Sequence, residues 1–184
     1  MFYFLLALCD RPQLDEDLVD ELKKSSDDSF SSSDLLQNGL KESMRYKPVG
    51  PVIMRCAIHD DSYGNIPIPS GTNIILNLVD MHRRDQHFRN PNQFDLSNVS
   101  DKDISAMSGD RNYFLPFGSG PKECVGRWLA KVEMEVIIGN FLLNYKVHRS
   151  NGTKTLEELN TRWDIAQQPT DPGYMAVHPR IVKS

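Results

Sequence analysis

One cysteine lies in a segment whose composition could hold a sulfur atom in a fixed position. The stretch 114–128 reads FLPFGSGPKECVGRW, in which two prolines and two glycines precede Cys124 and an apolar, helix-like run follows it. Backbone N–H groups of a glycine-containing loop, and the N-terminus of a following helix, stabilise a thiolate. The pattern suits a thiolate ligand to a metal or haem iron, or a catalytic nucleophile. The alternative is a buried, inert cysteine at the end of a loop.

The composition is that of a folded chain without a strong charge bias. Of the 184 residues, 39% are hydrophobic and 25% are charged, which predicts the packed core of one ordinary domain. The formal net charge of −4 gives no reason to expect nucleic acid as a partner. Cys9 and Cys56 lie far from Cys124, and there is no C-x-x-C pair. Neither a zinc ribbon nor a disulfide framework is therefore indicated.

Four segments have the pattern of helices: 1–9, 13–24, 35–46 and 125–143. The first is an apolar run that is too short to span a bilayer, which requires about 20 residues. Asp34 is expected to cap the third helix through its side chain. Between the second and third, residues 25–34 are rich in serine and aspartate, which predicts a flexible, exposed linker.

The segments that bear on a β structure begin at residue 48. Three β-rich pieces lie between there and residue 79, interrupted by Asp, Gly and Pro, with a tight turn expected at 69–71. Residues 97–113 are polar and without periodicity, so a loop is expected. The tail after residue 144 is expected to form short strands and hairpins, one of them turning at 171–173.

The spacing around the cysteine is that of a known family. Phe117-x-x-Gly120-x-x-x-Cys124-x-Gly126 resembles the haem-ligand loop of the cytochrome P450 superfamily, the haem-thiolate monooxygenases. The long helical pattern after Cys124 resembles that family's L helix. The β-rich pieces after residue 48 resemble the strands beside the haem.

Two further motifs occur in that family's order. Glu42 and Arg45 resemble its E-x-x-R pair, and they lie three residues apart on one helical face, where an ion pair forms easily. Phe88, Pro91 and Phe94 resemble the segment that packs against this pair. In the family the pair is buried and fixes the helix to the loop before the cysteine.

The resemblance covers essentially the whole chain and implies a fold. We expect a mainly α structure with a smaller β part, the cytochrome P450 fold in truncated form. Residues 1–184 would be a single partial domain. It would contain the end of the I helix, the J and K helices, the β-sheet face, the haem-ligand loop, the L helix and a C-terminal hairpin.

Haem b is the implied cofactor, with Cys124 as the axial ligand to its iron. The implied cofactor-binding residues are Cys124, Phe117, Gly120, Gly126, Arg55 and Lys122. Arg55 and Lys122 would face the haem propionates, and the alternative for each is an ordinary solvated cation. Glu123, beside the thiolate, departs from the family pattern, because a carboxylate pointing inward would repel the thiolate charge.

The resemblance is strongest to the aromatase branch, which implies a lipophilic substrate, with a steroid as the leading candidate. Val52 and Met54 would line the substrate pocket, and Ile165 and Ala166 would belong to a turn that closes over it. The alternative is that Val52 and Met54 are ordinary core residues of a strand.

The implied activity is a monooxygenase reaction that uses O2 and electrons from an NADPH-dependent flavin reductase or a ferredoxin. The family's distal acid–threonine pair is not found in residues 1–184, so no catalytic residue is assigned. One alternative is a non-catalytic fragment with weak or no haem binding, and another is a reductase-independent peroxide isomerase of the same fold. A full-length relative would lie on the endoplasmic reticulum membrane, and we expect no membrane anchor in this chain.

Overall fold

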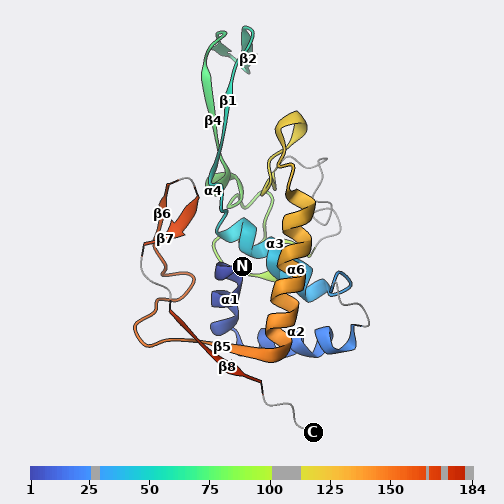
Figure 1. Cartoon of the computed structure of the whole chain (residues 1–184). Coiled ribbons are helices and arrows are strands. Elements are labelled where there is room, and N and C mark those ends of the chain that lie inside the picture. The colour runs from blue at the N-terminus through green and yellow to red at the C-terminus, as the bar shows by residue number, and fades with distance from the viewer. Residues whose placement is uncertain (26–29, 101–112, 165, 171–173, 181–184) are drawn as a thin grey trace.

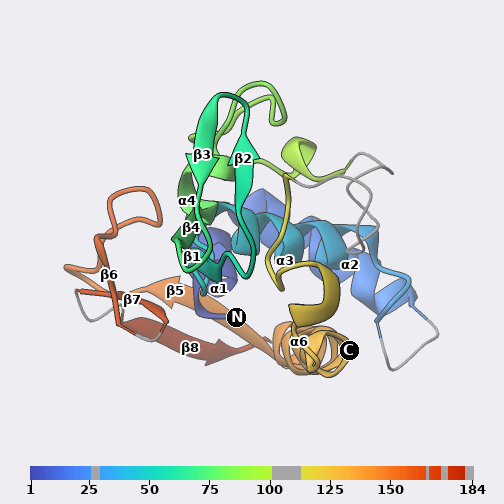
Figure 2. The same ribbon diagram turned by 90° about the horizontal axis from the view of Figure 1, so that it is seen from above.

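A computed structural model describes residues 1–25, 30–100, 113–164, 166–170 and 174–180 of the chain. A helical body carries several two-stranded β ribbons (Figure 1). One long ribbon extends from the top of the body, and another closes the bottom beside the C-terminal end of the long helix. In the view from above, the long ribbon points toward the viewer, and the helices lie below it and to one side (Figure 2). The expectation of a mainly α fold with a smaller β part is confirmed.

The helices lie close to where the sequence predicts them. They are α1 (Phe2–Cys9), α2 (Pro12–Lys24), α3 (Asp34–Tyr46), α4 (Leu78–Met81) and α6 (Arg127–Asn144), with 3-10 turns η1 (Leu96–Asn98) and η2 (Gly120–Lys122). The predicted cap of α3 is wrong by one residue. Ser33 Oγ accepts the hydrogen bond from the Leu36 N–H at 3.1 Å, and Asp34 is the first residue of the helix.

The described strands pair in antiparallel, two-stranded ribbons. They are β1 (Val52–Cys56), β2 (Asp61–Tyr63), β3 (Ile66–Ile68), β4 (Asn73–Asn77), β5 (Tyr145–Arg149), β6 (Thr161–Trp163), β7 (Gln167–Pro169) and β8 (Met175–Pro179). The pairs are β1 with β4, β2 with β3, β5 with β8 and β6 with β7. In the long ribbon, Val52 is paired with Asn77 and Cys56 with Asn73. The turn expected at 69–71 is confirmed, since the Thr72 N–H donates to the Pro69 carbonyl. The turn expected at 171–173 lies outside the described residues.

Helix α1 lies at the centre of the main core. It packs against α2, α3 and β5, and its residues Phe4, Leu6 and Ala7 have no exposed surface. Gly39 of α3 faces Phe4 directly, and a Cβ atom at Gly39 would overlap the Phe4 ring. The glycine, which is costly in a helix interior, is therefore explained by the close approach of α1 to α3.

The segment 25–34 contains a buried anchor. Residues 26–29 lie outside the described residues, but Phe30 and Ser33 are buried. Phe30 has a φ of 55°, and its ring lies against Gly139 of α6 at a position where a side chain on the glycine would collide with it. The serine-rich composition predicted exposure for these two residues, and this is wrong because the aromatic ring joins the core.

Among the described residues, no helix combines the length and the apolar character needed to cross a membrane.

Candidate cofactor-binding site

The Glu42–Arg45 pair is the centre of a buried hydrogen-bonded network, here called the support of the candidate site. Arg45 Nε and Nη2 each donate to a Glu42 carboxylate oxygen at 2.7 Å, and both side chains are 0% exposed. Arg45 Nη1 donates to the His82 and Pro91 carbonyls at 2.7 and 2.8 Å, and Nη2 donates to the Gln93 carbonyl at 2.9 Å. A guanidinium has five N–H donors, and all five are used.

Glu42 is satisfied in the same way. Its Oε1 accepts from the Asp95 N–H and from Asn98 Nδ2, both at 2.9 Å. Burial raises the pKa of Glu42, and the hydrogen bonds and charge of Arg45 act in the opposite direction. The pair thus ties α3 to the segment 82–98. The pair is buried, as the family resemblance implies. The hydrogen bonds identify the segment 82–98 as the part of the chain that it holds.

Phe88, Pro91 and Phe94 all contact this support or lie beside it. Phe88 is buried, with Arg45 Cζ 5.1 Å from its ring centroid, and Pro91 provides one of the carbonyl acceptors. The Phe94 ring packs edge-on against Tyr46, with the ring centroids 6.4 Å apart.

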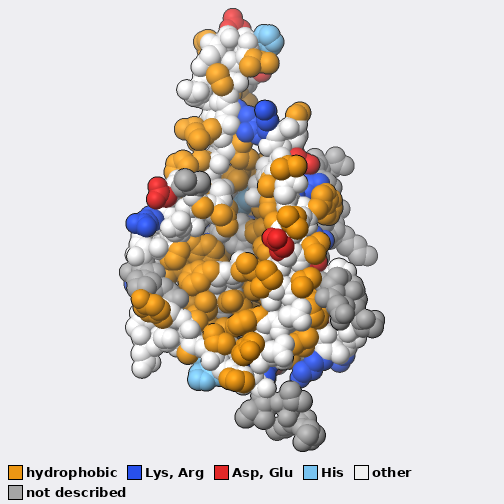
Figure 3. Space-filling view, in the orientation of Figure 1, with side chains coloured by type: hydrophobic (Ala, Val, Ile, Leu, Met, Phe, Trp, Pro, Cys, Tyr) orange, Lys and Arg blue, Asp and Glu red, His pale blue; other side chains and the backbone are white. Residues whose placement is uncertain are grey.

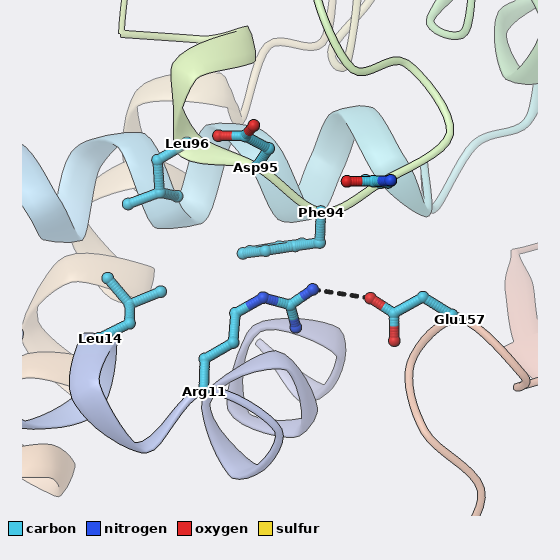
Figure 4. A pocket seen from close by; sticks show the side chains of 7 residues that line it. Arg11, Leu14, Phe94, Asp95, Leu96 and Glu157 are labelled. Carbon is cyan, nitrogen blue, oxygen red and sulfur yellow. Dashed lines mark hydrogen bonds and ion pairs between the residues drawn. The ribbon is translucent and has the colours of Figure 1, made fainter.

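Phe94 also stacks against the guanidinium group of Arg11. Arg11 Cζ is 4.9 Å from the Phe94 ring centroid, and Nη2 donates to Glu157 Oε1 at 2.7 Å (Figure 4). Arg11 Nη1 also donates to the Ala7 carbonyl. Arg11 thereby connects α1, the segment around Phe94 and the loop that contains Glu157.

His82 connects the support to the cysteine loop. Its carbonyl accepts from Arg45, and its Nε2 accepts from the Leu115 N–H at 3.1 Å. The imidazole is fully buried and lies 5.3 Å from the Phe114 ring, centroid to centroid. Burial, with the nearby Arg45 charge, lowers the pKa of His82 to about 4.

The cysteine loop has the compact geometry that its glycines predict. Gly118 and Gly120 have φ angles of 77° and 72°, in the left-handed region that favours glycine. The Cys124 N–H donates back to the Phe117 carbonyl at 2.8 Å, which closes the loop. At Gly126, a Cβ would lie 3.9 Å from Cys124 Sγ, an ordinary contact. Gly126 therefore does not owe its identity to the sulfur atom.

Cys124 is exposed, so the burial assumed in the alternative reading of this cysteine is wrong. It lines a groove of about 460 Å³ between β1 and the loop that precedes η2. Sequence-predicted residues meet in this groove: Cys124, Phe117, Arg55, Lys122, Val52 and Met54. Gly120 and Gly126 are in the loop but not among the groove's lining residues. The volume is within the range of small-molecule and cofactor sites, about 300–1,000 Å³.

The two cations in the groove are exposed. Arg55 Nη1 donates to the carbonyl of its neighbour Met54, and within the described part of the chain neither Arg55 nor Lys122 forms an ion pair. Glu123 does form one: its Oε2 accepts from Arg127 Nη1 at 2.8 Å. The carboxylate of Glu123 is thus paired with Arg127, the first residue of α6, and is not an isolated negative charge beside Cys124.

A second cavity, of about 230 Å³, adjoins the groove. Both are lined by Val49, Pro116 and Phe117. The second extends toward Tyr3 of α1 and Met134 of α6. The face seen in Figure 1 carries many hydrophobic side chains in this region (Figure 3). Together, the two cavities provide apolar walls beside an accessible thiol.

The remaining predicted residues, Ile165 and Ala166, fall between β6 and β7 in the sequence. Ile165 lies outside the described residues. Ala166 is half-buried, and its carbonyl accepts from the Asp164 N–H. The next residue, Gln167, donates its N–H to the Val49 carbonyl at 2.7 Å, which attaches β7 to the edge of the groove. Ala166 itself is not among the groove's lining residues.

Leu115 and Asn98, which the sequence did not single out, complete the site together with His82, which the sequence indicates as a structural residue and not as a ligand. Asn98 is buried against Glu42, and Leu115 lines the groove. A histidine at the end of a short helix and an asparagine in a polar loop carry no periodic signal. Their roles depend on contacts across 33 and 56 residues of sequence.

Comparisons with known proteins agree with this arrangement. The family model described as Cytochrome P450 matches residues 1–175. The chain is 34% identical over 175 residues to "Aromatase 3" of Sus scrofa and 33% identical over 177 residues to "Aromatase" of Taeniopygia guttata. These alignments cover 92% and 93% of the chain but only 33% of each relative. The chain therefore spans about a third of the length of these curated relatives.

A solved structure shows the same fold. It is described as "Zebra fish cytochrome P450 another structure with Abiraterone" and matches with a TM-score of 0.80 at 29% identity. The match covers 97% of this chain and 43% of the solved one.

Proposed function

Because the chain belongs to the cytochrome P450 family, we propose that it forms the thiolate side of a haem site in a monooxygenase, with Cys124 as the iron ligand. The observation that carries this proposal is the groove. It brings an accessible thiol, two exposed cations and apolar side chains into one space. This combination suits a planar, largely apolar cofactor that carries two carboxylates.

The residues of the groove have distinct proposed roles. Cys124 would hold the iron, and Phe117 would pack against the macrocycle. Arg55 and Lys122 would bind the propionates, because cations pair with carboxylates and both side chains are exposed. When bound, haem supplies a redox centre, and a thiolate ligand increases the electron density at iron in the way that favours O–O cleavage.

The substrate is proposed to be lipophilic, with a steroid as the leading candidate. Val52 and Met54 line the groove, and their apolar side chains suit such a molecule. The steroid assignment rests on similarity to proteins named aromatase. Ile165 and Ala166 are proposed to belong to a turn that closes over the substrate.

Electrons would come from an NADPH-dependent flavin reductase or a ferredoxin, and a protein with the length of the relatives would act at the endoplasmic reticulum membrane. These are proposals for such a longer protein, because the chain spans only a third of the relatives' length.

A second function is supported by a specific observation. Cys124 is exposed and the groove is open, so the chain by itself could act as a non-catalytic fragment that binds haem weakly. Ligand exchange with water is easier when the shell around an iron ligand is incomplete.

Titration of the full chain with haem, followed by Soret absorbance, tests the proposal. Cys124→Ala should weaken haem binding at least about tenfold and change the Soret maximum, because the axial ligand is lost. Cys56→Ala is the matched control, since Cys56 is also exposed and lies outside the groove. Equal affinities and spectra for both variants would refute Cys124 as the ligand.

A further inference from the structure

We propose that His82 is a positioning residue, whose neutral imidazole holds the Cys124 loop in its haem-ready geometry through the Leu115 N–H. This inference rests on the proposed function, because it concerns the loop that carries the iron ligand. His82 lies outside the groove and would not contact the cofactor.

The hydrogen bond fixes the tautomer of the ring. A backbone N–H can only donate, so Nε2 of His82 must be the unprotonated acceptor in the 3.1 Å contact with Leu115. The ring proton then resides on Nδ1. Within the described residues, Nδ1 has no hydrogen-bond partner. Burying the Nδ1–H group without a partner costs free energy, so the hydrogen bond at Nε2 must offset part of this cost.

The ring is held from the side of α3. The His82 carbonyl accepts from Arg45 at 2.7 Å, and the His82 N–H donates to the Leu78 carbonyl at 2.8 Å. The ring lies against Phe114 at an interplanar angle of 47°. The backbone of His82 is therefore fixed by Arg45 and α4, and its ring contacts the cysteine segment at Phe114 and Leu115.

From Leu115, a short series of contacts reaches the cysteine. The Leu115 carbonyl accepts from the Gly118 N–H at 3.1 Å, and the Phe117 carbonyl accepts from the Cys124 N–H at 2.8 Å. Leu115, Phe117 and Gly118 all line the groove. A displacement of Leu115 would therefore move the wall of the groove and also Phe117, whose carbonyl accepts the hydrogen bond from the Cys124 N–H.

The charge state of the ring supports this role. Burial, with the Arg45 charge nearby, lowers the pKa of His82 to about 4. The ring is then neutral at physiological pH, and Nε2 stays an acceptor. Gln is the conservative replacement, because its side-chain oxygen can accept at a similar reach, whereas Leu removes the acceptor.

The experiment uses the full chain and begins with the imidazole nitrogen shifts of His82 by NMR at neutral pH, without haem. We expect a neutral ring with the proton on Nδ1. A protonated Nε2 would overturn the proposal, and this result does not depend on any variant folding.

Amide exchange at Leu115 and haem titration then compare His82→Gln, His82→Leu and the control His87→Gln, which alters an exposed histidine of the same segment. In the Leu variant, Leu115 protection and haem affinity should each fall about tenfold, as expected for a lost buried hydrogen bond. The Gln and control variants should retain both. Full protection in His82→Leu, or loss in His82→Gln equal to that in His82→Leu, would overturn the proposal.

The two claims fail in different ways. If Leu115 protection depends on His82 but no variant or parent chain binds haem, the proposed function fails and the positioning role stands. If the parent chain binds haem through Cys124 and Leu115 protection is independent of His82, only the positioning role fails.

Discussion

His82 is hydrogen-bonded to Arg45 through its backbone and to the cysteine loop through its side chain. Arg45 Nη1 donates to the His82 carbonyl at 2.7 Å, and the imidazole of the same residue accepts from the Leu115 N–H at 3.1 Å. The buried ion pair of α3 is thereby connected to the loop that carries Cys124, although Arg45 does not contact the loop's cysteine. Arg45 and His82 therefore couple the stability of the fold to the shape of the groove.

Replacing Arg45 should be among the most damaging single changes in the chain. Arg45→Ala leaves the buried Glu42 carboxylate without its partner, so we expect a loss of about 3–5 kcal/mol in the free energy of unfolding. Arg45→Lys should also destabilise strongly, because an ammonium group has only three N–H donors and lacks the planar geometry that reaches all five acceptors. Urea unfolding followed by circular dichroism measures both.

Arg84→Ala is the control for that comparison. Arg84 pairs with Asp80 at 2.8 Å on an exposed surface, where such a pair contributes little to stability. A loss for Arg45→Ala as small as that for Arg84→Ala would contradict the assigned role of the buried pair.

The pH dependence of stability should contain a contribution from His82. Its pKa is about 4 in the folded chain against 6.5 for an unperturbed imidazole. Between these values the unfolded state binds a proton that the folded state does not, so stability falls as the pH is lowered from 6.5 toward 4. The slope from this group is at most about 1.4 kcal/mol per pH unit.

His82→Gln isolates this contribution, because it removes the titrating group and leaves Glu42 and the other carboxylates in place. The free energy of unfolding of the parent chain should therefore fall relative to that of the variant as the pH is lowered from 6.5 toward 4. Parallel curves for the two proteins would show that His82 does not titrate in this way.

Gly39 gives a test of the α1–α3 contact. In an exposed helix, Gly→Ala stabilises by up to about 1 kcal/mol. At Gly39 the new methyl group would overlap the Phe4 ring, so we expect destabilisation instead, by about 1–3 kcal/mol. Thermal unfolding measures the sign.

Gly50→Ala is the matched control, because no atom lies within 4 Å of the position of a Cβ at Gly50. Its effect should stay within about 0.5 kcal/mol. An increase in stability for Gly39→Ala would mean that α1 and α3 are less closely packed than described.

The sequence was sufficient for the parts of the structure that repeat or follow a fixed spacing. The four main helices follow from apolar periodicity and the position of Pro12, and the cysteine loop follows from its glycines. The meeting of Arg55, Lys122 and Cys124 in one groove was implied by the family resemblance, and no local pattern predicts it.

The parts that the sequence did not predict depend on single contacts between distant segments. Phe30 was assigned to an exposed linker because its neighbours are serines, but its ring is buried against Gly139 of α6. His82 had no recognised partner, because its acceptor role requires Leu115, 33 residues away. Asp34 and Ser33 are both good capping residues, and only the geometry of the turn selects Ser33.

The most direct test of the account is the spectrum of the haem-loaded chain after reduction and addition of carbon monoxide. If Cys124 is the iron ligand, the parent chain and Cys56→Ala should show the red-shifted Soret band that electron donation from a thiolate produces. Cys124→Ala should lack this band. A parent chain without the band, or the same band in Cys124→Ala, would contradict the assignment of Cys124 as the haem ligand.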